Sequence, residues 1–315
     1  MGQTGAMLDL DRAARLLALC PAHAPTPLHR HGPLWLKDET GRMGLGAFKA
    51  LGGVHAACLL LARARGVTPE ALHGTAGPEV LVCASAGNHG IAVATGARLF
   101  GARARIHIAG TVPEAFAARL RAAGAEVIRS GRRYEDAMTA AARDDGILLP
   151  DGDAHADALA PRLVMEGYTQ IARELAAQMP SVPERVYLQA GVGGLAAAMA
   201  EGMAALWPAM PEVVVVEPEA APCLRDGVAA GRIVTVDGPV SAMGRLDCKA
   251  ASALPLAILA RRADRFETVS DAEAQAAADH AATLGHPTTP SGAAGLACAL
   301  RDGGAGLCIL SEGPE

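Results

Sequence analysis

The chain has 315 residues, of which 51% are hydrophobic and 19% are charged, a composition typical of a globular protein large enough for two lobes. A net charge of −5 provides no broad cationic field for a phosphate backbone, and 3% aromatic residues provide few surfaces for base stacking. These values argue against nucleic acid as a partner.

Strand-like and helical apolar runs alternate along the chain. In chain order they predict strand 34–37, helix 49–65, strand 80–84, helix 91–100, strand 104–109, helix 113–123, strand 126–129, helix 134–143, strands 147–149 and 186–190, helix 195–206, strand 213–217, helices 271–284 and 292–301, and strand 307–310. This alternation predicts an α/β fold with two lobes, each a parallel sheet with helices on both faces. We expect residues 1–60 and 147–315 to form the large domain and 61–146 the small one.

The cysteines and the N-terminus bear on the compartment. Seven cysteines, an odd number without a Cys-x-x-Cys pair, argue against a disulfide framework or a zinc cage and favour a reducing, cytoplasmic compartment. Residues Met1 to Ala6 show no basic segment followed by an apolar run, so we expect no signal peptide. No apolar stretch approaches membrane-spanning length, so a membrane is not expected as a partner.

Lys49 is the first candidate catalytic residue. It follows a glycine-rich loop at 41–46 and lies among small and apolar neighbours. Such surroundings favour the neutral amine over the ammonium form. A neutral amine is the form that condenses with an aldehyde to an imine. The alternative is a surface lysine at the start of a helix.

The segment Ser85-Ala86-Gly87-Asn88-His89-Gly90 lies between a predicted buried strand and a helix. Its glycines and the helix N-terminus offer free backbone N–H groups, which suit a carboxylate. Asn88 has a side-chain amide that can donate to a phenolic oxygen. The alternative is an ordinary capped turn.

The segment from Gln189 to Ala196 also follows a strand and opens a helix, and its glycine loop is a candidate phosphate site. It has a second interpretation. Gly191, Gly193 and Ala196 fit the dinucleotide fingerprint, with Glu217 at the end of the next strand. That interpretation predicts an NAD-dependent enzyme, but it explains neither Lys49 nor Asn88.

Ser311, after the last predicted strand, supplies a hydroxyl that can meet a pyridine nitrogen, although a simple turn explains it as well. Together the four segments require a ligand with an aldehyde, a phenolic oxygen, a phosphate and a ring nitrogen. Pyridoxal 5'-phosphate has all four groups.

The chain resembles the fold-type II pyridoxal-phosphate enzymes, the group of threonine dehydratase and the tryptophan synthase β subunit, and within it diaminopropionate ammonia-lyase. The combination of Gly46-Ala47-Phe48-Lys49-Ala50-Leu51-Gly52-Gly53 with Gly87-Asn88-His89-Gly90 is specific to this group. Segments 189–194, 216–218 and 290–295 extend the resemblance over nearly the whole chain. It implies a two-lobed fold, a large domain that binds pyridoxal 5'-phosphate, and a homodimer.

The resemblance also assigns roles to residues. Lys49 would be the imine lysine, Asn88 would face the phenolic oxygen, and Ser311 would face the ring nitrogen. Asp151 matches an aspartate that acts on the substrate's Cα proton. The phosphate would be held by Gly191, Val192, Gly193 and Gly194, and the substrate carboxylate by Ser85, Ala86, Gly87, Asn88 and His89, with His89 mainly holding the loop.

The chain departs from the family pattern at several positions. Ala86 stands where the family has an aspartate that serves the D isomer, so we expect preference for L-amino acids. The family's acidic, aromatic stretch after Asp151 is changed. Arg245, Asp247 and Lys249 replace small residues. They either line the substrate pocket, with Arg245 as a substrate contact, or face solvent and pair with each other.

The resemblance implies α,β-elimination on a small β-substituted L-amino acid, 2,3-diaminopropionate or similar, which gives a 2-keto acid and ammonia. Asp151 or the freed Lys49 is the candidate base. Dehydration of a hydroxy amino acid, racemisation and β-replacement remain open with the same cofactor. An NAD-dependent enzyme using residues 191–196 and a non-catalytic binding protein are the remaining alternatives.

Overall fold

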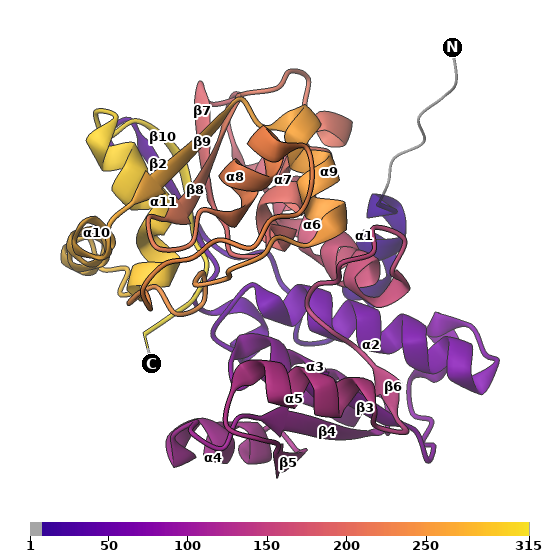
Figure 1. The fold of residues 1–315 in the computed structure, drawn as a ribbon. Helices are drawn as coiled ribbons and strands as arrows, with labels where there is room; N and C mark the ends of the chain where they lie inside the picture. Colours follow the sequence, from indigo (N-terminus) through magenta and orange to yellow (C-terminus); the bar gives the residue numbers. More distant parts are fainter. Residues whose placement is uncertain (1–7, 315) are drawn as a thin grey trace.

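The structure, a computed structural model, describes residues 8–314. In this part of the chain the strands form a six-stranded sheet and a four-stranded sheet, which confirms the expected α/β organisation (Figure 1). Residues Met1 to Ala6, where no signal peptide is expected, lie outside the described residues. Among residues 8–314, no helix combines the length and the apolarity needed to cross a membrane.

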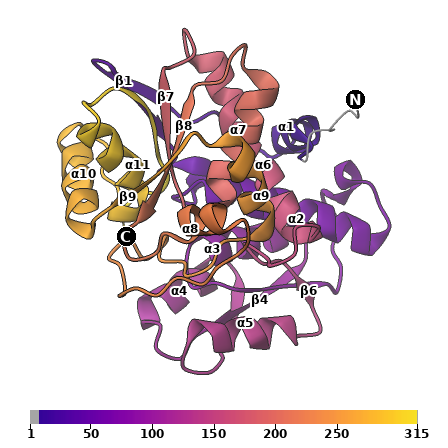
Figure 2. The ribbon, with the colours of Figure 1, turned by 45° about the horizontal axis from the view of Figure 1, so that its top comes forward.

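The larger sheet has the strand order β1-β2-β10-β7-β8-β9 and is parallel except for the β1–β2 hairpin. Its strands are β1 (Leu28–His31), β2 (Leu34–Asp38), β7 (Arg185–Gln189), β8 (Glu212–Pro218), β9 (Arg265–Val269) and β10 (Gly306–Leu310). In both views α10 (Asp271–Thr283) and α11 (Pro290–Arg301) lie on one side of β8, and α7 (Gly194–Leu206) lies on the other (Figure 1, Figure 2).

The packing of strand β8 explains its central apolar run, Val213–Val216. Val213 and Val215 belong to the core cluster that includes α7, whereas Val214 and Val216 belong to the cluster under α10 and α11. Successive side chains of a strand point to opposite faces, so a sheet covered on both sides needs an unbroken apolar run.

The smaller sheet has the order β5-β4-β3-β6 and is parallel. It consists of β3 (Val80–Ala84), β4 (Arg103–Ile108), β5 (Ala125–Arg129) and β6 (Ile147–Leu148), with helices α3 (Asn88–Leu99), α4 (Glu114–Ala122) and α5 (Tyr134–Ala142) between them. Strand β6 lies just beyond the expected boundary at 146, yet it pairs with β3. The division into domains otherwise stays a prediction.

Helix α2 (Lys49–Arg65) joins the two parts, because it packs against both α3 and α6 (Leu159–Gln178). Glycines make both contacts close. A Cβ atom on Gly52 would lie 2.4 Å from a ring atom of Tyr168, and one on Gly53 would lie 2.5 Å from Cβ of Ala92. The pair Gly52-Gly53 therefore fixes the position of α2, and with it that of Lys49.

A buried charge network holds the loop that precedes Lys49. Glu174 of α6 accepts hydrogen bonds from Lys37 at 2.6 Å and from Arg42 at 2.8 Å, and Arg42 also donates to Glu39 at 2.7 Å. These side chains are at most 2% exposed. Arg42 belongs to the 3-10 helix η1 (Arg42–Gly44), so the network ties β2 and this loop to α6.

The remaining elements were not expected from the sequence. They are α1 (Leu10–Ala18), the 3-10 helix η2 (Pro69–Leu72), α8 (Cys223–Ala230) and α9 (Ala253–Arg262), in addition to η1, α6, β1 and β9.

Candidate active site

Strand order explains where the predicted site residues meet. In the smaller sheet the chain leaves β3 towards β4 and β5 and later returns to β6, on the other side of β3; in the larger sheet β10 returns beside β7. Ligands of parallel α/β sheets bind at such reversals, beyond the carboxyl ends of the strands. The Ser85 segment follows β3, Asp151 follows β6, the turn 191–194 follows β7 and Ser311 follows β10.

Lys49 contacts Asp151 directly. Its Nζ lies 2.5 Å from Oδ2 of Asp151, although 102 positions separate the two residues in the chain. The same Nζ lies 5.2 Å from the ring centre of Phe48 and 5.6 Å from that of Tyr168. Of these two rings only Phe48 was expected beside Lys49 from the sequence, and the closest group is a carboxylate.

Asp151 is held as a carboxylate. Its burial works to raise its pKa, whereas the charge and hydrogen bond of Lys49 lower it, and the balance leaves the pKa of Asp151 below the usual value. The hydroxyl of Tyr168 lies 3.5 Å from Oδ1 of Asp151. An ionised carboxylate beside the reactive amine suits a group that accepts a proton.

His89 is buried and hydrogen-bonded to the backbone after β6. Its Nε2–H donates to the carbonyl of Leu149 at 2.9 Å, which fixes the end of β6 and hence Asp151. Burial lowers the pKa of His89, so the ring is neutral. Its Nδ1 lies 3.8 Å from Asp151 Oδ1. These contacts agree with the expectation that His89 mainly holds this loop.

The turn 191–194 has the geometry of an anion site. Gly193 adopts φ +98°, and a Cβ there would lie 2.8 Å from Cβ of Pro255. Within residues 8–314 no side chain caps the start of α7, which begins at Gly194. Uncapped N–H groups at a helix N-terminus favour a phosphate. The residues present therefore fit the phosphate of pyridoxal 5'-phosphate.

The glycine turn lies close to Lys49, as one cofactor touching both requires. A Cβ on Gly194 would lie 3.7 Å from Cε2 of Tyr168, the ring that Lys49 Nζ faces. A Cβ on Gly152, next to Asp151, would lie 3.5 Å from Cγ2 of Val192. Tyr168 and Asp151 thus bridge the two expected cofactor contacts.

The C-terminal segment closes the same space. The carbonyl of Ser311 accepts a hydrogen bond from the N–H of Phe48 at 3.1 Å, which places Ser311 beside the start of α2. Ser311 is 5% exposed. Its neighbour Glu312 accepts a hydrogen bond from Asn88 Nδ2 at 2.5 Å and another from Thr289 at 2.6 Å. Asn88 and Ser311 therefore approach Lys49 from opposite lobes.

The three charged departures separate into two groups. Lys249 Nζ donates to Asp247 at 2.6 Å, so these two pair with each other. Arg245 instead faces the Ser85–His89 loop: its Nε lies 3.3 Å from Oε2 of Glu312, and a Cβ on Gly87 would lie 3.6 Å from its guanidinium. Of the three, Arg245 is the one placed to meet a substrate.

The dinucleotide interpretation fails at Glu217. Its carboxylate accepts hydrogen bonds from the N–H groups of Leu224 at 2.7 Å and Arg225 at 2.9 Å, at the start of α8. Glu217 is fully buried. An acid that caps a helix inside the core is not available to a ribose hydroxyl.

Two residues of this region lacked a sequence signal. Tyr168 lies in α6, which was not expected as a helix, and Glu312 stood beside Ser311 without an assigned role. Glu312 is 5% exposed and links Asn88, Arg245 and Thr289. A carboxylate flanking a predicted cofactor contact is the only hint that the sequence carried.

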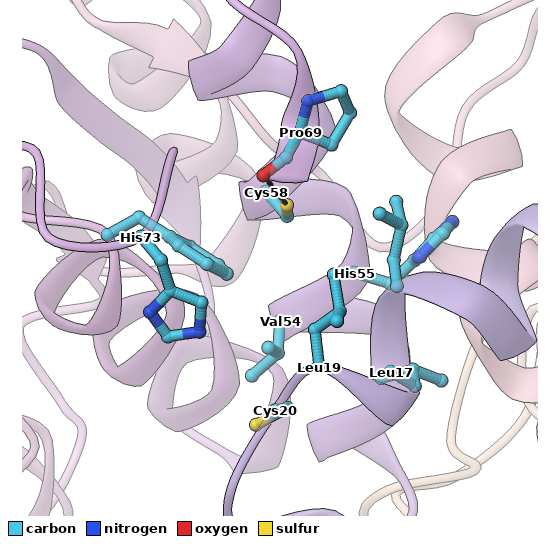
Figure 3. A pocket seen from close by; sticks show the side chains of 10 residues that line it. Leu17, Leu19, Cys20, Val54, His55, Cys58, Pro69 and His73 are labelled. Atoms are coloured by element: carbon cyan, nitrogen blue, oxygen red, sulfur yellow. Dashed lines mark hydrogen bonds between the residues drawn. The ribbon is translucent and has the colours of Figure 1, made fainter. Parts of the chain in front are cut away.

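A separate small pocket lies between α1, α2 and η2 (Figure 3). It has a volume of about 20 Å³ and is lined mainly by apolar side chains such as Leu17, Val54 and Cys58. That space holds about one water molecule. None of its lining residues belongs to the predicted site, so it is not the substrate pocket.

The family model described as "Pyridoxal-phosphate dependent enzyme" matches residues 19–306. Diaminopropionate ammonia-lyase from Salmonella typhimurium is 33% identical over 232 residues, which are 65% of this chain and 57% of that protein. The match thus spans less than two thirds of the length of this relative.

Solved structures agree over nearly the whole chain. The diaminopropionate ammonia lyase of Escherichia coli, in complex with an aminoacrylate-PLP azomethine reaction intermediate, gives a TM-score of 0.85 at 25% identity and covers 99% of this chain and 91% of its own. The T.th. threonine deaminase gives a TM-score of 0.81 at 26% identity, with 98% of each chain covered. The fold is therefore fold type II, and the chain belongs to the pyridoxal-phosphate-dependent enzyme family, with pyridoxal 5'-phosphate as its cofactor.

Proposed function

We propose that this enzyme is an ammonia-lyase that catalyses α,β-elimination on a small β-substituted L-amino acid similar to 2,3-diaminopropionate, giving a 2-keto acid and ammonia. The observation that carries the proposal is the 2.5 Å contact between Lys49 Nζ and Asp151 Oδ2, beyond the carboxyl ends of the strands. The similarity to diaminopropionate ammonia-lyase supports the reaction class.

Each group has a role in this proposal. Lys49 holds the cofactor through its amine, and the turn 191–194 holds the phosphate. When bound, pyridoxal 5'-phosphate withdraws electrons from the substrate's Cα bonds. Ser311 would offer its hydroxyl to the ring nitrogen, which would leave the ring uncharged and would suit a reaction in which the β group departs promptly.

Asp151 is the proposed base for the Cα proton. Its lowered pKa and its contact with Lys49 Nζ at 2.5 Å support this role. The backbone N–H groups of residues 85–89 and the Asn88 amide are proposed to orient the substrate carboxylate. Ala86, which replaces the family's aspartate on that loop, offers no proton acceptor for a D isomer.

The test compares both isomers of 2,3-diaminopropionate in an assay for keto acid and ammonia. We expect the L isomer to be preferred, and Asp151→Asn to lower kcat by about 10²–10⁴-fold, the usual contribution of a general base. Ala86→Asp is the matched variant, because it restores the missing acid and is expected to raise turnover of the D isomer. Equal turnover of both isomers by the native enzyme would contradict the assignment.

Lys49→Ala tests the cofactor attachment separately. We expect the visible absorbance band of the covalently held cofactor to disappear, while a variant outside the site, such as His280→Ala, keeps it. An unchanged spectrum after Lys49→Ala would defeat the role of Lys49, whatever the substrate is.

Arg245 favours a second candidate function, the dehydration of a β-hydroxy amino acid such as serine or threonine. A guanidinium facing the Ser85–His89 loop repels the β-ammonium group of diaminopropionate, but it does not repel a hydroxyl. The likeness to threonine deaminase agrees with this alternative. Arg245→Gly restores the family residue, so it is expected to shift the ratio of kcat/KM values towards diaminopropionate.

We also propose a homodimer in a reducing, cytoplasmic compartment, on the family resemblance and on the cysteines. All seven cysteines are free, and six of them are buried. Light scattering on the purified protein measures the oligomeric state.

A further inference from the structure

A cluster of three histidines and one aspartate lies at the edge of the larger sheet, outside the proposed active site. His29 and His31 stand two positions apart on β1, so their side chains share one face of the sheet. Asp38 ends β2, and His286 lies in the connection between α10 and α11. Neither the reaction nor the cofactor uses these residues.

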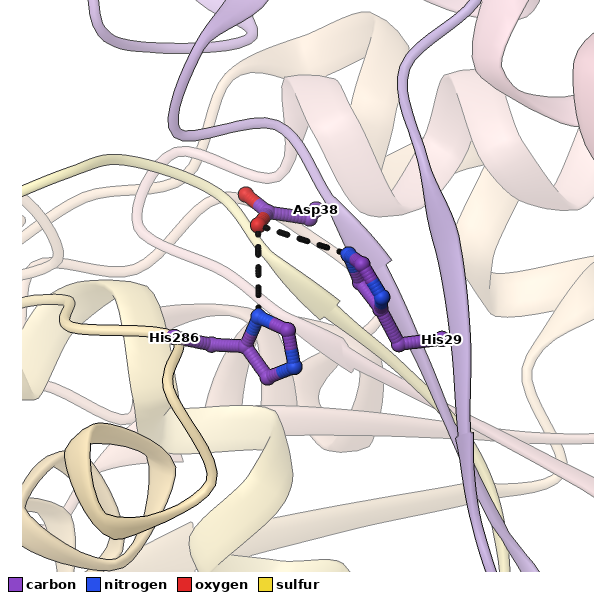
Figure 4. Close-up of side chains that lie close together, drawn as sticks. All are labelled: His29, Asp38 and His286. Atoms are coloured by element: carbon purple, nitrogen blue, oxygen red, sulfur yellow. Dashed lines mark ion pairs between the residues drawn. The ribbon is translucent and has the colours of Figure 1, made fainter.

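Three ligand atoms converge in this cluster. Nε2 of His29 lies 3.8 Å from Oδ2 of Asp38, and Nδ1 of His286 lies 3.6 Å from the same oxygen. Figure 4 shows the Asp38 carboxylate facing both rings. Ligand atoms around a tetrahedral zinc ion, at bond lengths of about 2.0–2.1 Å, lie roughly 3.3 Å apart. All three ligand atoms lie within 4.8 Å of one another, so the two rings would have to approach each other by at most about 1.5 Å to close this set around an ion.

The outer contacts of the cluster are those that a metal site needs. Nε2 of His286 lies 3.1 Å from Nε2 of His31, so His286 can donate its second ring N–H there while Nδ1 stays free to bind. The other carboxylate oxygen of Asp38 accepts hydrogen bonds from the N–H of Thr40 at 2.9 Å and from its hydroxyl at 2.5 Å. Such contacts orient metal ligands and fix the histidine tautomer.

We propose that His29, Asp38 and His286 bind one divalent transition-metal ion of the zinc class. Two imidazole nitrogens with one carboxylate oxygen suit zinc, cobalt or nickel, whereas calcium and magnesium prefer oxygen ligands. The side chain of His29 is 35% exposed, compared with 15% for Asp38 and 11% for His286. An ion can therefore enter on the His29 side, and water completes its coordination.

The position of the site gives the ion a structural role. Thr288 and Thr289, which follow His286 closely, donate hydrogen bonds to Glu312 at 2.5 and 2.6 Å. Asp38 pairs in register with Leu310, the residue before Ser311. An ion bound here joins the β1–β2 hairpin to the segment that supports Glu312 and Ser311.

The test titrates the chelator-treated holoenzyme with cobalt(II) and records its visible d–d band, which lies to the red of the cofactor band. We expect one cobalt ion per chain, displaced by zinc. Asp38→Asn and His29→Ala should each weaken binding by at least about 100-fold, and His31→Phe by about 10–100-fold, as for an outer-contact residue. His280→Ala, an exposed histidine of α10, is the matched control and should bind like the native protein.

The outcomes separate clearly. His29→Ala changes the most exposed of the three ligands, so it tests the site even where Asp38→Asn disturbs the fold. Circular dichroism checks that each variant is folded. Absence of a cobalt band in the native protein, or equal bands in the native protein and His29→Ala, would overturn the proposal. Because the readout is cobalt absorbance, failure of the proposed reaction leaves this result unaffected.

Discussion

Replacing Gly193 by alanine tests whether the glycine turn is fixed by the fold itself. The native φ of +98° is a conformation that costs a residue with a Cβ about 1–2 kcal/mol. The new Cβ would lie 2.8 Å from Cβ of Pro255 and 3.0 Å from Cδ2 of Leu224. Overpacking of this kind costs about 1–3 kcal/mol. The free energy of unfolding should therefore fall by about 2–5 kcal/mol.

Gly194→Ala is the matched control, one position along. A Cβ at Gly194 would lie 3.7 Å from Tyr168 and 3.8 Å from Met165, which are ordinary contacts, and this residue begins α7. Its stability should be unchanged or slightly higher, because alanine favours a helix by up to about 1 kcal/mol over glycine.

Urea denaturation of the cofactor-free forms gives both values without a contribution from ligand binding. Equal midpoints for Gly193→Ala and Gly194→Ala would refute the reasoning, since the two positions would then be equivalent.

Substitutions at three buried residues, Glu174, Glu217 and Tyr168, test the core. Glu174→Gln leaves Lys37 and Arg42 buried with one carboxylate fewer, so the free energy of unfolding measured in urea should drop by about 3–5 kcal/mol. The control is Asp11→Asn, at an exposed ion pair with Arg173, which should not change the free energy of unfolding measurably. Burial raises the pKa of Glu217 to about 7 against the opposing helix N–H groups. A carboxyl group whose pKa is raised in the folded state contributes its full stabilisation below its unfolded-state pKa, and this stabilisation is lost as pH rises through 7. Between pH 6 and pH 8 the free energy of unfolding of the native protein should therefore fall by about 1 kcal/mol more than that of Glu217→Gln. A parallel loss in both proteins would contradict this prediction. Tyr168→Ala should lower the free energy of unfolding by about 3–5 kcal/mol, because the ring is fully buried. Tyr168→Phe should lower it much less, because the tyrosine hydroxyl makes only a 3.5 Å contact. Thermal melts that give the two variants the same stability would be evidence against the packing argument.

The sequence predicted most clearly those apolar elements that glycines delimit, such as Gly66 after α2 and Gly87 after β3. Helix 49–65 and strand 80–84 match α2 and β3. Helix α6, which packs against α1, α2 and α7, was missed because it begins without a side-chain N-cap and its buried face includes the charged residues Glu166 and Glu174. Strand β1 was missed because its residues Leu28–His31 are mostly polar and lie at the sheet edge.

The site shows a similar division between local and distant information. Lys49, Asn88 and the turn 191–194 stood out because loops that hold a cofactor constrain the local sequence. The contact between Lys49 and Asp151 joins residues 102 positions apart, and only the return of β6 beside β3 produces it. Glu312 and Tyr168 carry no motif, because their roles depend on which side chains the packing of α6 and β10 brings to them.

The proposed cofactor contacts and the proposed substrate contacts come largely from different sheets. The residues proposed to hold the phosphate and the ring nitrogen follow β7 and β10 of the larger sheet, whereas the loop proposed to bind the substrate follows β3 of the smaller sheet. Ala86 lies on that second loop, and Arg245 faces it. A substitution at either position changes charge or acidity next to the substrate while the glycine turn keeps its geometry. We therefore expect the departures from the family pattern at Ala86 and Arg245 to affect which amino acid reacts rather than whether the cofactor binds.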